Sequence, residues 1–244
     1  MSGHNKWSKI KHKKIILDSK RSKIWTKAIK EISYTSKMFG QNLETNYKLK
    51  KAIYEAKLIN IPKNTINKAI KKNLKNNNTN YEKLNYEGYD PNGVAILIEC
   101  ITNNRNRTFS NIKKNFNKLK CKISKNSLTQ YNFQKKQKLI FKKNKYPLLT
   151  EDILLEYGLD FGIEDIKTKN DSLIIICDLS NSKILQKKLH INNLTANIIK
   201  ISTIPNRIVH LSHDKAKTLL NLISLLKSLD DVTRIWHNMN IVDS

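Results

Sequence analysis

The stretch YEGYDPNGVAILIECITNNRNRTFSNIKKNFNKLK, residues 86–120, constrains the fold more than any other part of the sequence. In the tetrapeptide DPNG at 90–93, proline presets φ and glycine closes a turn. The next eight residues, VAILIECI, are almost all apolar and predict a buried strand. A helix capped by Thr108 or Ser110 should follow, because apolar residues recur at helical spacing. These residues are Phe109, Ile112, Phe116 and Leu119. The stretch therefore predicts a βα unit.

The chain after this unit predicts a second group of strands and helices. The segments KLIFKK, SLIIICDLS and ANIIKISTIP have strand character, and TEDILLEYGLDFG and SKILQKKLHIN have helical character. After Pro205, RIVHLS predicts a short strand, residues 213–229 a helix and DDVTRIWHN a closing strand. The inward residues of that helix are expected to be Ala216, Leu219, Leu220, Ile223 and Leu226. One half of a sheet thus precedes the central group and the other half follows it, which suggests a split sheet with an inserted domain.

The first 75 residues predict a small helical unit. Residues 18–39 form a helix with apolar positions on one arc, namely Ile24, Trp25, Ala28, Ile29, Ile32 and Phe39. Two more helices are expected, one through Leu49, Ile53 and Ala56 and one opened by Pro62 with Ile66, Ala69 and Ile70 inward. The predicted class is α+β in three domains. Residues 1–78 form a basic helical domain, residues 79–132 and 205–244 a split α/β domain, and residues 133–204 an inserted α/β domain. Both α/β domains are expected to have open, ferredoxin-like sheets.

The amino-terminal arm MSGHNKWSKIKHKK carries five lysines, and no acidic residue occurs before Asp18. The apolar run at 15–17 is too short for a secretory signal peptide. His4 and His12 lack partners at zinc-site spacing, so no metal is expected. We interpret the arm as a surface for a negatively charged partner, in which Trp7 either packs in the protein or stacks on an unpaired base.

The formal charge of +26 predicts a polyanionic partner, although lysine, asparagine and isoleucine codons are A/T-rich and a biased genome would inflate it. The distribution of charge is more informative than the total. Residues 1–80 carry 20 basic and 4 acidic residues, residues 81–150 carry 15 and 4, and residues 151–244 carry 11 and 12. The positive charge is concentrated in the first two thirds, and the near-neutral third domain is not expected to contact nucleic acid.

A lysine stripe lies opposite the apolar arc of the first helix, and it is formed by Lys20, Lys23, Lys27, Lys30 and Lys37. Such a stripe can follow a phosphate backbone or can simply be solvated. Arg105 and Arg107 are two of five arginines among 46 basic residues, and they stand before a helix where a bound phosphate would be favourable. The alternative for this pair is an internal salt bridge to Glu87, Asp90 or the residues 230–231.

The sequence contains no recognisable catalytic motif, so neither an enzyme nor a cofactor is expected. His210 and His213 are interpreted as ordinary side chains, Cys100 as a buried hydrophobe, and Asp230 and Asp231 as a turn. No apolar run approaches the length of a membrane span. Three cysteines without framework spacing fit a reducing compartment, so we expect a cytoplasmic protein.

Five segments resemble the YebC family, which includes the PmpR-type regulators. In order along the whole chain they are GHNKWSKIKHKK, DSKRSKIWTKAIKEI, YEGYDPNGVAILIEC, NNRNRT and DDVTRIWHN. The resemblance implies three domains, with the third inserted in the second. It also implies one of two functions, because members are described as probable DNA-binding transcriptional regulators and relatives as ribosome-associated translation factors.

The expected function is a non-enzymatic, nucleic-acid-binding regulator of gene expression, and the alternative is a translation factor that binds rRNA or the ribosome. An enzyme acting on nucleic acid would need several converging carboxylates, and the first 80 residues offer four. No small-molecule substrate or membrane is expected as a partner, and the protein is expected to be a monomer. The resemblance carries the binding role to Lys6, Lys9, Lys11, His12, Lys13, Lys20, Arg21, Lys23, Lys27, Arg105 and Arg107. The charge pattern adds Lys14 and Lys30.

Overall fold

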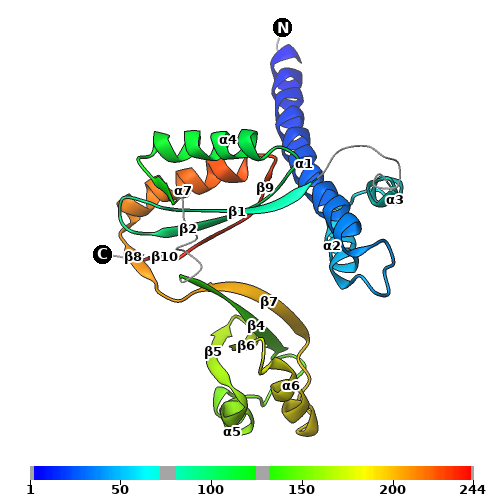
Figure 1. Cartoon of the computed structure of the whole chain (residues 1–244), viewed down its shortest axis with the longest axis vertical. Helices are drawn as coiled ribbons and strands as arrows, with labels where there is room; N and C mark the ends of the chain where they lie inside the picture. Colours follow the sequence, from blue (N-terminus) through cyan, green and yellow to red (C-terminus); the bar gives the residue numbers. More distant parts are fainter. Residues whose placement is uncertain (1–2, 72–80, 125–131, 243–244) are drawn as a thin grey trace. The chain divides into compact units, whose positions relative to one another are not determined.

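The computed structural model describes residues 3–71, 81–124 and 132–242, without the side chains of residues 3–13 and 16. The chain divides into two compact units. The first consists of Met1–Thr129 and Val209–Ser244, and the second of Gln130–Ile208. The second unit is therefore inserted into the first along the chain (Figure 1).

The first unit begins with three helices: α1 (Gly3–Phe39), α2 (Tyr47–Leu58) and α3 (Lys63–Lys71). Helix α1 begins at Gly3 instead of near Asp18, so the arm is helical. The reason is local, because no glycine or proline lies between Gly3 and Gly40, and lysine is a good helix former. Gly40 ends the helix with a φ of 84°, in the left-handed region that favours glycine.

The three helices share one apolar core. The residues predicted to face inward on α2 are buried, as are Ile66 and Ala69 on α3. On α1, Ile32 is buried and Trp25 packs against the core, but Ile24 and Phe39 are exposed. The indole N–H of Trp25 donates a hydrogen bond to the carbonyl of Ile59 over 3.1 Å, which ties α1 to the end of α2.

The first unit also holds an antiparallel sheet with the strand order β3-β1-β2-β9. Its strands are β1 (Glu82–Tyr89), β2 (Ala95–Thr102), β3 (Lys122–Ser124) and β9 (Val232–His237). Strand β9 pairs directly with β2 although more than 130 residues separate them, so the predicted split sheet is confirmed. A parallel pair, β8 (Val209–Leu211) with β10 (Met239–Ile241), completes this unit's strands.

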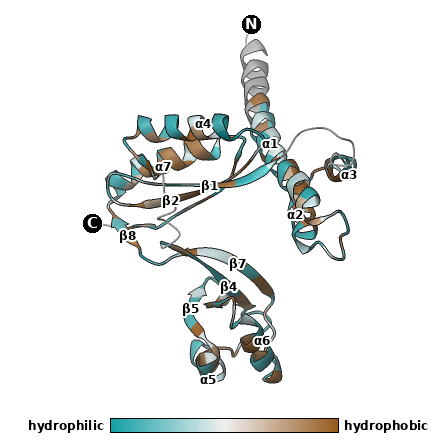
Figure 2. Ribbon diagram, viewed as in Figure 1, coloured by the Kyte–Doolittle hydropathy of each residue, from teal (hydrophilic) through white to brown (hydrophobic). Residues whose placement is uncertain are grey.

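Helices α4 (Arg105–Lys118) and α7 (His213–Lys227) pack on this sheet (Figure 1). Hydrophilic residues follow the outer side of α4 (Figure 2). Two details of the sequence prediction are wrong. The residue that caps α4 is Asn104, whose side chain accepts a hydrogen bond from the N–H of Arg107. On α7, Leu220 is exposed and Leu222 is buried, because the helix turns its apolar stripe slightly away from the predicted arc.

The second unit is a four-stranded antiparallel sheet of order β5-β6-β4-β7 with two helices. In chain order its elements are β4 (Phe133–Lys142), α5 (Glu151–Gly158), the short 3-10 helix η2 (Leu159–Phe161), β5 (Ile163–Lys169), β6 (Ser172–Asp178), α6 (Ser182–Ile191) and β7 (Ile198–Pro205). This βαββαβ order is ferredoxin-like, as expected. Strand β5 was not predicted, because it is a largely exposed edge strand without an apolar run.

Candidate nucleic-acid interface

Asp231 lies at the centre of a buried polar cluster in the first unit. Its side chain is 10% exposed and accepts hydrogen bonds from the Lys30 ammonium over 2.6 Å and the Thr108 hydroxyl over 2.8 Å. The guanidinium of Arg107 lies 3.3 Å from the second carboxylate oxygen. Burial would raise the pKa of Asp231, but the hydrogen bonds and the positive charges outweigh burial and hold its pKa below the usual value. Three segments far apart in the sequence are thereby joined at one carboxylate.

Three lysines of the α1 stripe, Lys23, Lys27 and Lys30, contact the end of α7 and the residues that follow it. Lys27 donates a hydrogen bond to the carbonyl of Lys227 over 2.6 Å, and Lys23 donates to the carbonyl of Ser228 over 3.4 Å. Lys30 adds a bond to the carbonyl of Asp230. The last carbonyls of a helix lack intrahelical partners and carry partial negative charge, so ammonium groups stabilise them. Burial is the largest influence on Lys27 and lowers its pKa.

These contacts change the interpretation of four predicted site residues. Lys23, Lys27 and Lys30 form part of the joint between α1 and α7. The sequence alone allowed two other interpretations of these lysines, a phosphate-binding face or a solvated face. Arg107 forms the internal salt bridge that was the alternative to phosphate binding, with Asp231 as its partner, although the Arg107 side chain remains 50% exposed. Arg105 is exposed and makes no ion pair among the described residues, so the two arginines differ in their contacts.

Within α1, the predicted site cations that make no contact with the end of α7 lie towards the amino terminus of the helix. Lys14, Lys20 and Arg21 are exposed, and the guanidinium of Arg21 lies 4.8 Å from the ring centre of Trp25. The residues Lys6, Lys9, Lys11, His12 and Lys13 lie within α1, but their side chains are outside the described part. Figure 1 shows the amino-terminal turns of α1 projecting beyond the sheet, with no described element of the first unit beside them.

A second basic surface lies on α2 and was not predicted from the sequence. Tyr47 and Tyr54 are 74% and 63% exposed, and they line a groove of about 510 Å³ together with three lysines, one glutamate and two apolar residues, namely Lys50, Lys51, Lys57, Glu44, Leu43 and Ile53. The seven-residue spacing of the tyrosines was the available signal, since it places both on one side of a helix. Exposed aromatic rings beside lysines suit unpaired bases and their phosphates.

The buried cysteines have the properties of structural residues. Burial is the main cause that raises the pKa of Cys100 to about 12, and it also raises the pKa of Cys121, to about 11. Within residues 3–71, 81–124 and 132–242, no group of three or more His, Cys, Asp or Glu side chains is arranged to hold a metal ion. In the same ranges, no helix combines the length and apolar character needed to cross a membrane.

The fold and the charge pattern define a class of protein, namely an α+β chain with a basic helical amino terminus and one antiparallel sheet unit inserted into another. Comparison with known families narrows this class. Residues 5–76 match the model of the TACO1/YebC protein N-terminal domain, and residues 81–239 match that of the TACO1/YebC second and third domain. The chain therefore belongs to the TACO1/YebC family, as the sequence segments indicated.

Individual relatives agree with this assignment. A "probable transcriptional regulatory protein" of Borrelia turicatae is 38% identical over 245 residues, covering 100% of this chain and 99% of the relative. A protein of the same description from Syntrophus aciditrophicus is 37% identical and covers 100% and 97%. The crystal structure of a conserved hypothetical protein from Aquifex aeolicus matches with a TM-score of 0.71 and 29% identity, covering 93% of each chain.

Proposed function

We propose that the protein is a non-enzymatic regulator of gene expression that grips a nucleic acid backbone with the amino-terminal half of α1. The observation that carries the proposal is the exposed basic stretch Lys14–Arg21, which continues the lysine-rich arm on one projecting helix. Each phosphate neutralised by a lysine releases counterions, so such a helix would bind polyanions regardless of sequence. The names of the relatives, which refer to transcriptional regulation, support this class of function.

The proposed interface is divided between an anchor and a contact surface. Lys23, Lys27 and Lys30 fix the direction of α1 by binding α7, and the preceding turns extend from that joint. The part of α1 that precedes Lys23, from Gly3 to Ser22, spans about 30 Å, so this segment extends well beyond the joint. Arg105 adds an exposed cation at the start of α4, where the free backbone N–H groups favour a phosphate.

Transcriptional regulation through DNA is the first form of this proposal. A basic α-helix has dimensions that fit the DNA major groove. The segment has few side chains suited to reading base edges, because lysines dominate it and phosphate contacts carry no sequence information. We therefore expect strong binding to DNA with little sequence preference from α1 alone.

The second form is a translation factor that binds folded RNA, and the groove at Tyr47 and Tyr54 favours it. Proteins recognise RNA mainly at unpaired bases, which stack on aromatic side chains. Two exposed tyrosines flanked by Lys50 and Lys57 supply such a surface on the helical domain that also contains the arm. Duplex DNA offers no unpaired base for them.

Salt titration of binding tests the shared part of the proposal. In the variant K9Q/K11Q/K13Q/K14Q, the slope of log K against log salt on duplex DNA should fall by about 3–4 units if all four lysines touch phosphate. The control K63Q/K68Q/K215Q/K217Q removes the same charge from exposed positions on α3 and α7 and should keep the wild-type slope. An unchanged slope in the first variant would remove the arm from the interface.

Sedimentation separates the two forms. Lysate is run through a sucrose gradient at moderate salt, and fractions are probed for the protein before and after nuclease treatment. Co-migration with ribosomal subunits that survives DNase supports the translation factor. Recovery with DNA that is lost on DNase treatment supports the transcriptional regulator.

A further inference from the structure

The inserted unit is more basic than the charge of residues 151–244 indicates. Residues 133–204 hold 12 lysines and 8 acidic residues, because six lysines between 135 and 145 belong to this unit and not to the preceding one. The net charge of this unit is therefore positive, and the expectation of a near-neutral domain is not met. The location of these lysines on the sheet therefore decides whether the unit has a charged surface.

The strand register separates two faces of the sheet β5-β6-β4-β7. Leu139 and Phe141 on β4, and Ile175 on β6, belong to the core that α5 and α6 cover. Side chains alternate along a strand, so the even-numbered residues of β4 and β6 lie on the opposite face. Figure 1 shows both helices on one side of this sheet, and within the described part of the unit no helix covers the other side.

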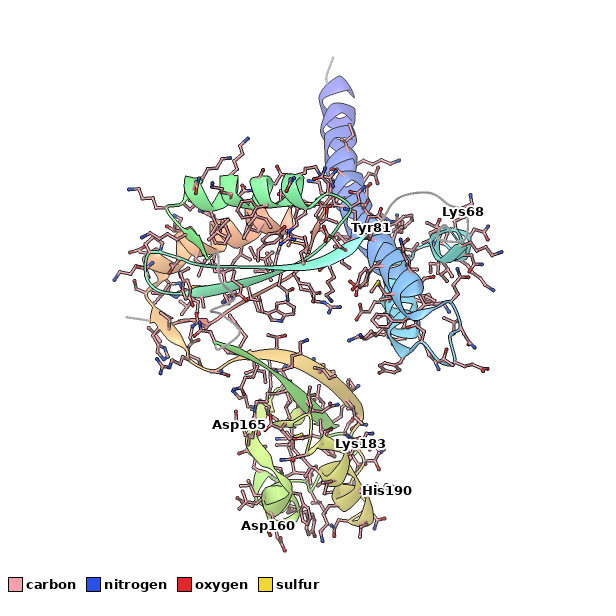
Figure 3. All side chains as sticks on the ribbon, viewed as in Figure 1. Lys68, Tyr81, Asp160, Asp165, Lys183 and His190 are labelled. Carbon is pink, nitrogen blue, oxygen red and sulfur yellow. The ribbon has the colours of Figure 1, made fainter. Side chains whose placement is uncertain are left out.

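The uncovered face is rich in lysine. The pairing of β4 with β6 and β7, and of β6 with β5, places six lysines on it: Lys136, Lys138, Lys142, Lys167, Lys169 and Lys200. Two of these are neutralised near the β5 edge. Lys136 binds Glu164 and Asp178 over 2.7 and 2.8 Å, and Lys167 lies 3.2 Å from Asp165, which Figure 3 labels.

The other four lysines, namely Lys138, Lys142, Lys169 and Lys200, make no ion pair among the described residues. Lys138 on the central strand β4 is directly opposite Lys200 on β7. Like charges at directly opposed positions destabilise a sheet, so stability alone does not account for this pair. Burial, followed by the charges of Lys200, Lys167 and Lys169, lowers the pKa of Lys138. A bound anion would relieve this repulsion.

We propose that this uncovered face, centred on Lys138 and Lys200, is a second binding surface for a nucleic acid backbone. The proposal takes its ligand class from the proposed function but places the site in the other unit. The apolar residues that share the face are isoleucines, at positions 140, 174, 176, 198 and 204, and its described side chains include no aromatic ring. The surface would therefore hold phosphates by the charge of its lysines and would not stack bases. Protein interfaces are depleted in lysine, which favours a phosphate polymer over an acidic protein.

The test compares three full-length variants with wild type on a 20-nucleotide mixed-sequence RNA. The face variant is K138Q/K142Q/K169Q/K200Q, and the arm variant is K9Q/K11Q/K13Q/K14Q. The control K143Q/K145Q/K183Q/K187Q removes the same charge from exposed positions of the same unit off this face; Figure 3 labels Lys183. If all four contacts exist, the salt slope of the face variant should fall by about 3 units. The control should keep the wild-type slope.

The outcomes separate this inference from the proposed function. A lower slope in the arm variant with an unchanged slope in the face variant overturns the inference and leaves the proposed function intact. A lower slope in the face variant with an unchanged slope in the arm variant supports the inference and shows that the arm is not part of the interface. An equal fall of the salt slope in the face and control variants also overturns the inference. The inference is likewise overturned if the face variant binds RNA as wild type does but no longer binds polyglutamate, because the face would then be assigned to an acidic protein.

Lysine footprinting of wild-type protein provides a measurement that does not depend on how the variants fold. Acetylation with and without the same RNA, followed by peptide mapping, should show protection of Lys138 and Lys200 in addition to the lysines of α1. Protection confined to residues outside 133–205 would overturn the inference.

Discussion

The substitution Asp231→Asn tests whether one carboxylate joins the helical part of the first unit to its sheet. Asparagine keeps an acceptor for Thr108 but removes the charge that binds Lys30 over 2.6 Å, where both side chains are at most 12% exposed. Breaking a buried ion pair costs about 3–5 kcal/mol, and a hydrogen bond to a charged group contributes about 1.5–3 kcal/mol. Because Lys30 retains the carbonyl of Asp230, we expect a loss of about 2–3 kcal/mol.

Tryptophan fluorescence during urea unfolding measures this loss. All three tryptophans, at positions 7, 25 and 236, lie in the first unit, so the signal reports on that unit alone. With a urea slope of about 2 kcal/mol per molar, the midpoint should fall by about 1 M. The control Asp230→Asn removes the same charge from an exposed neighbour and should change stability by less than about 0.5 kcal/mol. A midpoint for Asp231→Asn within 0.2 M of wild type, or an equal fall in the control, would refute the role of Asp231.

The contribution of Asp231 should also depend on pH. Its pKa is lower in the folded protein than in the unfolded chain, so the folded state is favoured when the group is ionised. The stabilisation is fully present above the unfolded value of about 3.9 and is lost as pH falls below it through the folded pKa. The difference in unfolding free energy between wild type and Asp231→Asn should therefore be constant from pH 8 to pH 5 and shrink below pH 4.

Three further predictions concern other parts of the chain. The high pKa of Cys100, about 12, together with burial of all three cysteines, predicts that a thiol reagent at pH 8 labels less than one cysteine in the native protein and three in urea. Gly88→Ala would place a Cβ against the Phe116 ring and the Lys122 carbonyl, so a cost of about 1–3 kcal/mol is expected in the same urea assay; an unchanged midpoint would contradict this packing. Replacing Tyr47 and Tyr54 by alanine should weaken binding to single-stranded RNA by about 1–3 kcal/mol per stacked base and leave duplex DNA binding unchanged, and equal losses on both ligands would exclude stacking.

Most of the secondary structure could be predicted because local patterns determine it. The turn at residues 90–93, the buried strand after it and the inward residues of α2 all follow from spacing along a short stretch of sequence. Strand β5 lacked such a signal, since an exposed edge strand need not alternate apolar and polar residues. The start of α1 was missed for a related reason, because the arm has helix-forming residues but no apolar periodicity to indicate a packed helix.

The role of Asp231 was predicted only in part, because its partners are distant in sequence: a salt bridge from the arginine pair to residues 230–231 was one alternative, but the contact with Lys30 was not foreseen. Lys30 lies 201 residues away and Arg107 lies 124 residues away, so no local pattern relates them. The pair Asp230-Asp231 resembles a polar turn, and Asp230 is indeed exposed. In the folded protein one of these adjacent aspartates is a surface residue and the other a buried hydrogen-bond acceptor. The sequence alone does not show which of the two is buried.

The lysines of α1 show why a charge stripe has no unique interpretation. Lys23, Lys27 and Lys30 have spacings of four and three residues, which aligns ammonium groups on one side of a helix. Phosphates along a nucleic acid carry full negative charges, and the carbonyl oxygens at a helix end carry partial negative charges. The same row of ammonium groups can therefore bind either. The position of α7 decides between them, because the carbonyl of Lys227 at its end and those of Ser228 and Asp230 just after it accept hydrogen bonds from Lys27, Lys23 and Lys30. A backbone bound by α1 would therefore have to lie on the amino-terminal side of Lys23, where the exposed cations Lys14, Lys20 and Arg21 begin and the arm continues them.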